Sequence, residues 1–131
     1  MTDSIEMFKI IDEDYESALE KVIAALKEEG FGILTEIDVK ETFKKKLNID
    51  DFERYKILGA CNPPFAKQAL DINRAVGVLL PCNVYVQEIE DNKTKVSAID
   101  PLKMFSVMPI AELESIAQEI YERLTRVIAS L

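Results

Sequence analysis

The amino-acid sequence predicts an α+β fold: a mixed, mainly antiparallel sheet, with the first helix and a long C-terminal helix packed on one face. Two long segments carry apolar residues at three- and four-residue steps, the pattern of amphipathic helices. Short apolar runs lie between them, and two late runs are joined by a polar turn typical of a β-hairpin. Because strands and helices stop alternating before the end of the chain, an α+β arrangement is favoured over a doubly wound parallel sheet.

The first half of the chain predicts two strands, each followed by a helix. Residues 5–11 form the first strand, and Asp14 is placed to cap the helix that follows. Gly30 is suited to the left-handed residue that ends this helix. Residues 31–37 form the second strand, and Asp38 then begins a short helix in an Asp-x-x-Glu capping box.

The second half predicts more strands between capped helices. These strands are expected at residues 55–60, 76–80, 83–89 and 94–99. The continuous apolar run 76–80 is expected to be the central strand, covered on both faces. Asn62 and Asp100 each precede proline and are placed as helix caps. The final helix, residues 110–131, shows one apolar stripe. Two ion pairs are expected outside that stripe, Glu119 with Arg123 and Glu122 with Arg126.

Composition limits the partners that the protein can have. The chain has 131 residues, and 16 basic against 24 acidic side chains leave a formal charge of −8. One domain over residues 1–131 is expected, because this length can bury a sufficient core. An acidic chain is poorly suited to nucleic acid, whose binding requires concentrated positive charge. No apolar stretch approaches the ~20 residues of a membrane span, so neither nucleic acid nor membrane is an expected partner.

Histidine is absent, which excludes a Ser-His or Cys-His catalytic pair and any imidazole-bound metal. The first nine residues carry two acids and no apolar run after a basic start, so no secretory signal is expected and the cytoplasm is the expected location. The two cysteines are accordingly expected to be reduced thiols. No cofactor, resident metal or complete catalytic residue set is expected.

The two cysteines lie in matching settings, residues 59–64 (GACNPP) and 80–83 (LPCN). If their strands are neighbours, Cys61 and Cys82 lie at the same strand end, within reach of a reversible disulfide or a shared soft metal such as Cu(I). The alternative is that each thiol is buried and inert, which is the commonest environment of cysteine beside apolar neighbours. Both interpretations stay open at this stage.

Polar residues at strand ends are further candidates for ligand contacts. These are Asn62, Asn83, Asp38 and Asp100. The asparagines can hydrogen-bond a ligand, and the aspartates can act as bases if burial raises their pKa. Capping and turn roles explain all four residues and are the preferred interpretation of each. Tyr55, Tyr85 and Phe65 can line a pocket, although aromatic residues on strands more often fill a core.

Four sequence blocks carry a family resemblance. They are residues 30–40 (GFGILTEIDVK), 55–64 (YKILGACNPP), 77–84 (GVLLPCNV) and 98–101 (AIDP). In this order they resemble the family called domain of unknown function 302, over nearly the whole chain. The resemblance implies an α+β fold and self-association, and it brings no established activity. It directs attention to Cys61, Asn62, Cys82, Asn83, Asp38 and Asp100 as the lining of a cleft.

Three kinds of function follow from these observations. The first is a non-enzymatic domain, homodimeric, that binds a small molecule in a pocket between the sheet and the long helix. The second is a thiol-dependent redox or soft-metal-binding protein that uses Cys61 and Cys82. The third is assembly alone, in which an apolar patch serves self-association. The first is preferred because no residue set completes a catalytic site.

Overall fold

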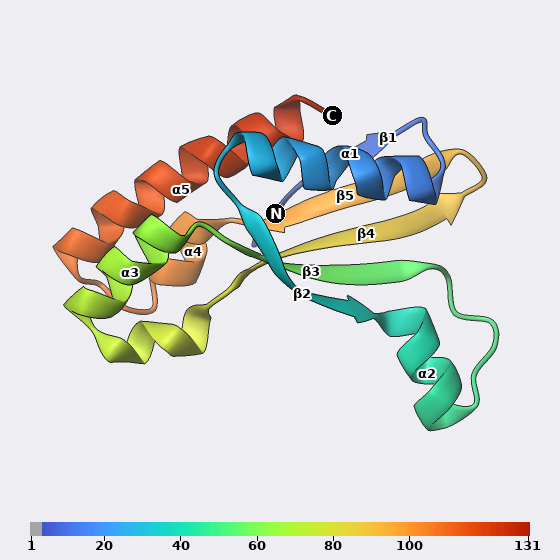
Figure 1. Cartoon of the computed structure of the whole chain (residues 1–131), viewed down its shortest axis with the longest axis horizontal. Helices are drawn as coiled ribbons and strands as arrows, with labels where there is room; N and C mark the ends of the chain where they lie inside the picture. Colours follow the sequence, from blue (N-terminus) through green and yellow to red (C-terminus); the bar gives the residue numbers. More distant parts are fainter. Residues whose placement is uncertain (1–3) are drawn as a thin grey trace.

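The computed structural model describes residues 4–131, and its helices and strands follow the predicted order except at residues 76–80 (Figure 1). The elements are β1 (Glu6–Ile11), α1 (Tyr15–Glu28), β2 (Gly32–Asp38), α2 (Val39–Leu47), β3 (Tyr55–Cys61), α3 (Pro63–Ile72), the 3-10 helix η1 (Arg74–Leu79), β4 (Cys82–Glu90), β5 (Lys93–Ile99), α4 (Pro101–Phe105) and α5 (Ala111–Ala129). No helix within the described range is long and apolar enough to cross a membrane.

The strands form one five-stranded sheet in the order β1-β5-β4-β3-β2. The α+β class is confirmed. All four strand pairings in this sheet are antiparallel, so the parallel component that the sequence suggested is not found among the described residues. The late hairpin is also confirmed, since β4 and β5 are neighbours joined at Glu90 and Lys93.

The prediction of a central strand at residues 76–80 is wrong. This segment belongs to η1, which Asn73 begins by accepting a hydrogen bond from the Ala75 amide at 2.8 Å. Val76 is buried whereas Val78 is 87% exposed, so the apolar run is covered on one side only. A short apolar run does not distinguish a strand from a buried helical turn, because both need few polar residues. Because residues 76–80 do not form a strand, the parallel pairing expected of this strand is not formed.

Helices α1 and α5 cover the same face of the sheet, as predicted (Figure 1). The residues that α1 buries recur at helical spacing: Tyr15, Ala18, Val22 and Leu26. Those of α5 do so as well: Leu113, Ile116, Ala117, Ile120, Leu124, Val127 and Ile128. These stripes pack against the buried side chains of β3, β4 and β5 to make the core. The opposite face of the sheet has no described helix across its middle, and α2 extends away from the sheet at the end of β2 (Figure 1).

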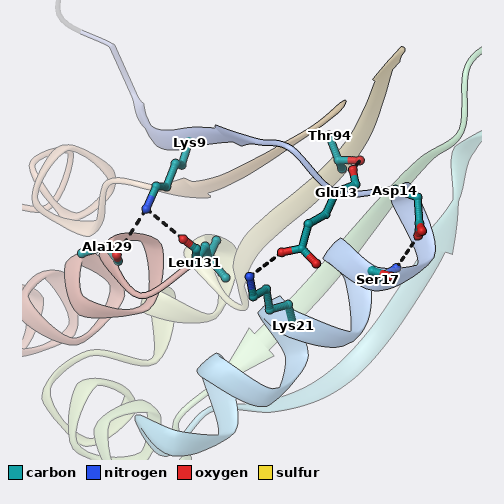
Figure 2. A network of polar contacts seen from close by, with 8 residues as sticks. All are labelled: Lys9, Glu13, Asp14, Ser17, Lys21, Thr94, Ala129 and Leu131. Carbon is teal, nitrogen blue, oxygen red and sulfur yellow. Dashed lines mark hydrogen bonds and ion pairs between the residues drawn. The ribbon is translucent and has the colours of Figure 1, made fainter. Parts of the chain in front are cut away.

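Polar contacts hold the ends of α1 and α5 against the sheet (Figure 2). The Asp14 carboxylate accepts from the Ser17 amide at 2.8 Å and caps α1, as the sequence predicts. Lys9 of β1 donates to the carbonyl oxygen of Leu131 at 2.9 Å and to that of Ala129 at 3.3 Å. A cation is favourable there because the C-terminal end of a helix carries partial negative charge.

The loop after α1 ends the helix as the sequence predicts. Gly30 has φ of +86°, a left-handed conformation that glycine adopts without steric cost. Its amide and that of Phe31 donate to the carbonyls of Lys27 and Leu26, in the manner of a Schellman turn. The chain is thereby turned directly from α1 into β2.

The two ion pairs expected along the C-terminal helix are not among the ion pairs of the described residues. Arg126 pairs instead with the Glu29 carboxylate at 2.9 Å. Arg123 donates to the backbone carbonyl of Glu29 at 3.0 Å. A spacing of four residues along one helix favours ion pairs within that helix. Here the end of α1 provides the carbonyl and the carboxylate of Glu29, and the two arginines bind these instead.

Candidate functional site

The register places the predicted site residues at two ends of the sheet. Ala60 pairs with Cys82, and Val84 pairs with Ala98. One end of the sheet therefore holds Cys61, Cys82, Asn83 and Asp100. Asp38 pairs with Lys56 at the other end of β2 and β3. The expected cleft therefore loses Asp38, because antiparallel pairing reverses the direction of neighbouring strands.

The two cysteines lie on neighbouring strands but their side chains point to opposite faces. Cys82 lies opposite Ala60 and shares its buried, helix-covered face. Cys61 follows Ala60 by one residue, so it faces the other side, as Asn83 does. Both cysteines are free thiols. Burial raises the pKa of Cys82 to about 12 and also raises the pKa of Cys61.

Asn62 is buried, and the prediction that its side chain caps α3 is wrong, since it makes no capping hydrogen bond. Its amide Nδ2 lies 3.5 Å from the Glu29 carbonyl oxygen, which Arg123 also contacts. A methyl group at Gly30 would approach this amide to 2.9 Å, so the Asn62 side chain would have to shift to accommodate it. Arg123 lies over the Phe65 ring, and its Nε is buried without a hydrogen-bond partner in the described part of the chain. Asn62 thus joins α1, α3 and α5.

The two aspartates act as helix caps, as the sequence predicts. Asp38 accepts from the Glu41 amide and Asp100 from the Leu102 amide, each at 2.9 Å. Asp38 also borders a small hollow of about 140 Å³ beside Tyr15 and Arg54. Capping therefore accounts for the hydrogen bonds of both carboxylates.

A polar cluster that the sequence did not single out lies on the open face, the side of the sheet away from α1 and α5. Its centre is Glu6, whose Oε1 accepts from the Tyr85 hydroxyl at 2.7 Å and from the Ser97 hydroxyl at 2.6 Å. Lys95 Nζ lies 3.3 Å from the same oxygen. The Ser97 and Tyr85 hydroxyl groups, followed by Lys95, lower the pKa of Glu6, whereas burial opposes them. The carboxylate is therefore held ionised.

Aromatic rings continue this cluster across the sheet. Lys95 lies between two rings, 4.3 Å from the centre of Phe8 and 5.5 Å from that of Tyr85. Tyr85 stacks on Tyr55 with ring centres 5.0 Å apart. Tyr55 in turn contacts Phe52 edge to face at 6.3 Å. Tyr55 and Tyr85 therefore lie on the open face, not in the core where strand aromatics are most often found.

The cluster borders a hollow of about 220 Å³. Its lining is Ile5, Glu6, Asn83, Tyr85, Ser97, Ala98 and Ile99. Asn83, a predicted site residue, and Tyr85, an aromatic residue predicted as a possible pocket wall, are among them. Within a single strand, alternation shows only that residues two apart share a face. The pairing of β1 with β5 and of β5 with β4 is what places Glu6 beside Ser97 and Tyr85. That is why the sequence missed Glu6 and Ser97.

A second hollow, of about 380 Å³, lies between β1 and α5, where the sequence places a pocket between the sheet and the long helix. It is lined by Met7, Phe8, Lys9, Tyr121, Thr125, Ile128 and Ala129. Two of its polar side chains are engaged with nearby backbone, since Lys9 bonds the end of α5 and Thr125 donates to the Tyr121 carbonyl at 2.7 Å. None of these lining residues is acidic, so among the described residues this hollow has no ionised carboxylate comparable to Glu6.

Comparison with known proteins decides the family. A family model described as Domain of unknown function DUF302 matches residues 8–131. The chain belongs to the DUF302 family. The resemblance seen in the four sequence blocks is thus confirmed, and the match includes every open-face residue named above except Glu6 and Ile5.

A solved DUF302 structure has the same fold. It is the crystal structure of an uncharacterised conserved DUF302 protein from Bacillus stearothermophilus, with a TM-score of 0.87 and 29% sequence identity. The alignment covers 97% of this chain and 98% of that one. No curated protein matches the chain. Within residues 4–131, no group of three or more histidine, cysteine or acidic side chains is placed to hold a metal ion.

Proposed function

We propose that this DUF302 protein is a non-enzymatic domain that binds a small molecule on the open face of its sheet. The observation that carries the proposal is the hollow beside Glu6, in which an ionised carboxylate meets apolar and aromatic walls. Binding sites for small molecules combine such walls with a few polar groups that orient the ligand.

The arrangement of donors indicates the chemistry of the ligand. The Tyr85 and Ser97 hydroxyls and Lys95 all approach Oε1 of Glu6, and no described group bonds Oε2. Asn83 is exposed, and its side-chain amide makes no hydrogen bond in the described part of the chain. Glu6 Oε2 therefore supplies an acceptor, and Asn83 supplies both a donor and an acceptor. A small amine, amide or alcohol with an apolar body fits this set.

The size of the hollow supports a ligand of metabolite size. Its volume of about 220 Å³ lies below the range of about 300–1,000 Å³ that is usual for drug-sized ligands. Ile5, Ile99 and the Tyr85 ring supply apolar contact around the polar centre. The Ser97 and Tyr85 hydroxyls both donate to Glu6, and the lowered pKa of this carboxylate makes it a weak base, which favours binding over catalysis.

The test is an NMR titration of the full chain with a panel of small amines, amides and alcohols that carry apolar groups. We expect shifts centred on Asn83, Tyr85 and Ser97. Glu6→Gln is expected to weaken amine binding about tenfold or more, because hydrogen bonds to charged groups contribute about 1.5–3 kcal/mol. Glu53→Gln is the matched control, since Glu53 bonds Gln87 outside the hollow. Shifts confined to the hollow between β1 and α5, or no shifts, would contradict the proposal.

The thiol function is the alternative, and one observation favours it: Cys61 and Cys82 follow the same end of two paired strands. Two other observations weigh against it. Their side chains face opposite sides of the sheet, and burial raises the pKa of both thiols, which lowers the thiolate fraction. Ligand binding on the open face therefore remains the preferred proposal.

A further inference from the structure

The segment that follows β2 is the least buried helical part of the structure. Every residue of α2, all within the described range, remains at least partly exposed. The helix lies beside β2 and β3 and extends away from the sheet at the end of β2 (Figure 1). We call residues 39–53, which comprise α2 and the loop after it, the α2 arm.

The α2 arm carries an apolar stripe with little cover in its own chain. Val39, Phe43 and Leu47 recur every four residues and so share one side of the helix. Phe43 meets the Phe52 ring edge to face at 4.9 Å, which closes the arm on itself. Beyond that contact Leu47 is 61% exposed and Ile49 is 36% exposed. An amphipathic helix with an uncovered stripe is typical of an interaction surface.

The two parts of the arm, helix α2 and the loop after it, carry net charges of opposite sign. Helix α2 carries four lysines and one glutamate, which leaves three positive charges. Residues 48–53 carry three acids and no base, which leaves three negative charges. The lysines 44–46 lie at the helix end, and Asp50 and Asp51 follow within a few residues.

We infer that the α2 arm docks against the α2 arm of a second copy of this chain. A partner that fits the arm must present both signs of charge beside apolar residues, and a second copy related by a two-fold axis does so automatically. Lys44 and Lys46 of one copy then face Asp50 and Asp51 of the other, while the exposed Leu47 and Ile49 side chains pack between them. A uniformly acidic or basic partner would match only half of the arm.

This inference does not depend on the open-face pocket, since Glu6 and Asn83 are not part of the arm. Ile37, two residues before the arm at the end of β2, is also 48% exposed. Charge complementarity steers association and sets the orientation, whereas the buried apolar side chains supply most of the affinity.

The experiment measures the molar mass of the full chain by sedimentation velocity over a wide concentration range. We expect a monomer–dimer equilibrium. Leu47→Asp with Ile49→Asp is expected to raise the dimer dissociation constant tenfold or more. Val78→Asp is the matched control, because Val78 is an 87% exposed valine on η1, outside the arm. A monomer at every concentration, or a dimer that withstands the arm substitutions, would overturn the inference.

A charge exchange separates docking from misfolding. Lys44→Glu with Lys46→Glu is expected to weaken the dimer, and so is Asp50→Lys with Asp51→Lys. Combining all four substitutions restores opposite charges across the two-fold axis, so the dimer is expected to return toward the wild-type dissociation constant. Circular dichroism of each variant checks that the fold is kept. If the fourfold variant dimerises no better than the two double variants, the arms do not face one another.

Discussion

Tyr55 of β3 and Tyr85 of β4 stack with ring centres 5.0 Å apart and an angle of 9° between the ring planes. They are diagonal neighbours in the register, because Tyr85 pairs with Ile57 and Tyr55 pairs with Gln87. The stack joins the polar cluster around Glu6 to Phe52 of the α2 arm. Through these contacts the middle of the open face and the arm form one aromatic row.

This stack is expected to stabilise the fold as a pair. We expect a double-mutant cycle with Tyr55→Leu and Tyr85→Leu to give a coupling of about 0.5–1.5 kcal/mol in the free energy of unfolding, the usual range for stacked aromatic pairs. Urea denaturation of the four proteins measures it. Tyr121→Leu on α5, combined with Tyr55→Leu, is the control and is expected to be additive. Additivity for the stacked pair would show that the rings are merely adjacent.

The Glu6 cluster is expected to make stability depend on acid pH. The pKa of Glu6 is lowered in the folded state, most strongly by Ser97. Its contribution is therefore present above the usual glutamate pKa of about 4.3 and is lost as the pH falls through the lower folded value. Ser97→Ala is expected to raise the pKa of Glu6 and to reduce stability above the usual glutamate pKa, and the loss is expected to fade as the pH falls through the folded value. A carboxyl ¹³C titration measures the pKa; an unchanged value in the variant would contradict the assignment.

The contact of Arg123 with the end of α1 is expected to matter more than the ion pair of Arg126. Arg123→Met removes a donor to the Glu29 carbonyl and is expected to lower the free energy of unfolding by about 1–2 kcal/mol. Arg126→Met, in the same helix, breaks an exposed ion pair with the same residue and is expected to have the smaller effect. Equal effects in urea denaturation would rule out a special role for Arg123.

Gly59 is expected to tolerate no side chain. A methyl group there would overlap Thr35 Oγ1 and approach Pro81 Cγ to 2.9 Å. Gly59→Ala is therefore expected to destabilise the protein by about 1–3 kcal/mol, the usual cost of overpacking. Adding Thr35→Ala removes the nearer clash and is expected to restore part of the loss. Gly32→Ala is the control, since nothing lies within 4 Å of its added methyl group. Equal loss in both glycine variants would refute this steric argument.

The cysteines are expected to react slowly in the native protein. The raised pKa values of Cys61 and Cys82 keep both as thiols near neutral pH, and Cys82 is also buried. A thiol-specific chromogenic reagent is expected to modify Cys61 slowly and Cys82 only on unfolding. Cys61→Ser and Cys82→Ser assign each phase. Rapid native modification of either residue near neutral pH would instead support the thiol-dependent alternative.

Local signals in the sequence were sufficient for most elements. The caps Asp14, Asp38 and Asp100 and the left-handed Gly30 act over three or four residues, so they can be recognised without knowledge of the fold. The same holds for the apolar stripes of α1 and α5. The prediction of a strand at residues 76–80 was wrong because an apolar run indicates burial without indicating whether the backbone is extended or helical.

The candidate site was predicted only in part. Asn83 was chosen from its place at a strand end, and it does border the hollow beside Glu6. Asp38 was chosen by the same reasoning, yet it lies at the opposite end of the sheet, since the direction of a strand depends on its partner. Asn62 was expected to cap a helix and instead contacts the end of α1.

The sequence by itself determined the α+β class, the capped starts of α1, α2 and α4 and the absence of histidine chemistry, because these depend on composition and on short-range signals. Only the tertiary structure decided which side chains meet. Glu6 and Ser97 are 91 residues apart in the chain, and Glu6 and Tyr85 are 79 residues apart. Such neighbours are set by strand order and register, which arise from packing of the whole sheet against its helices and leave no mark in either local segment.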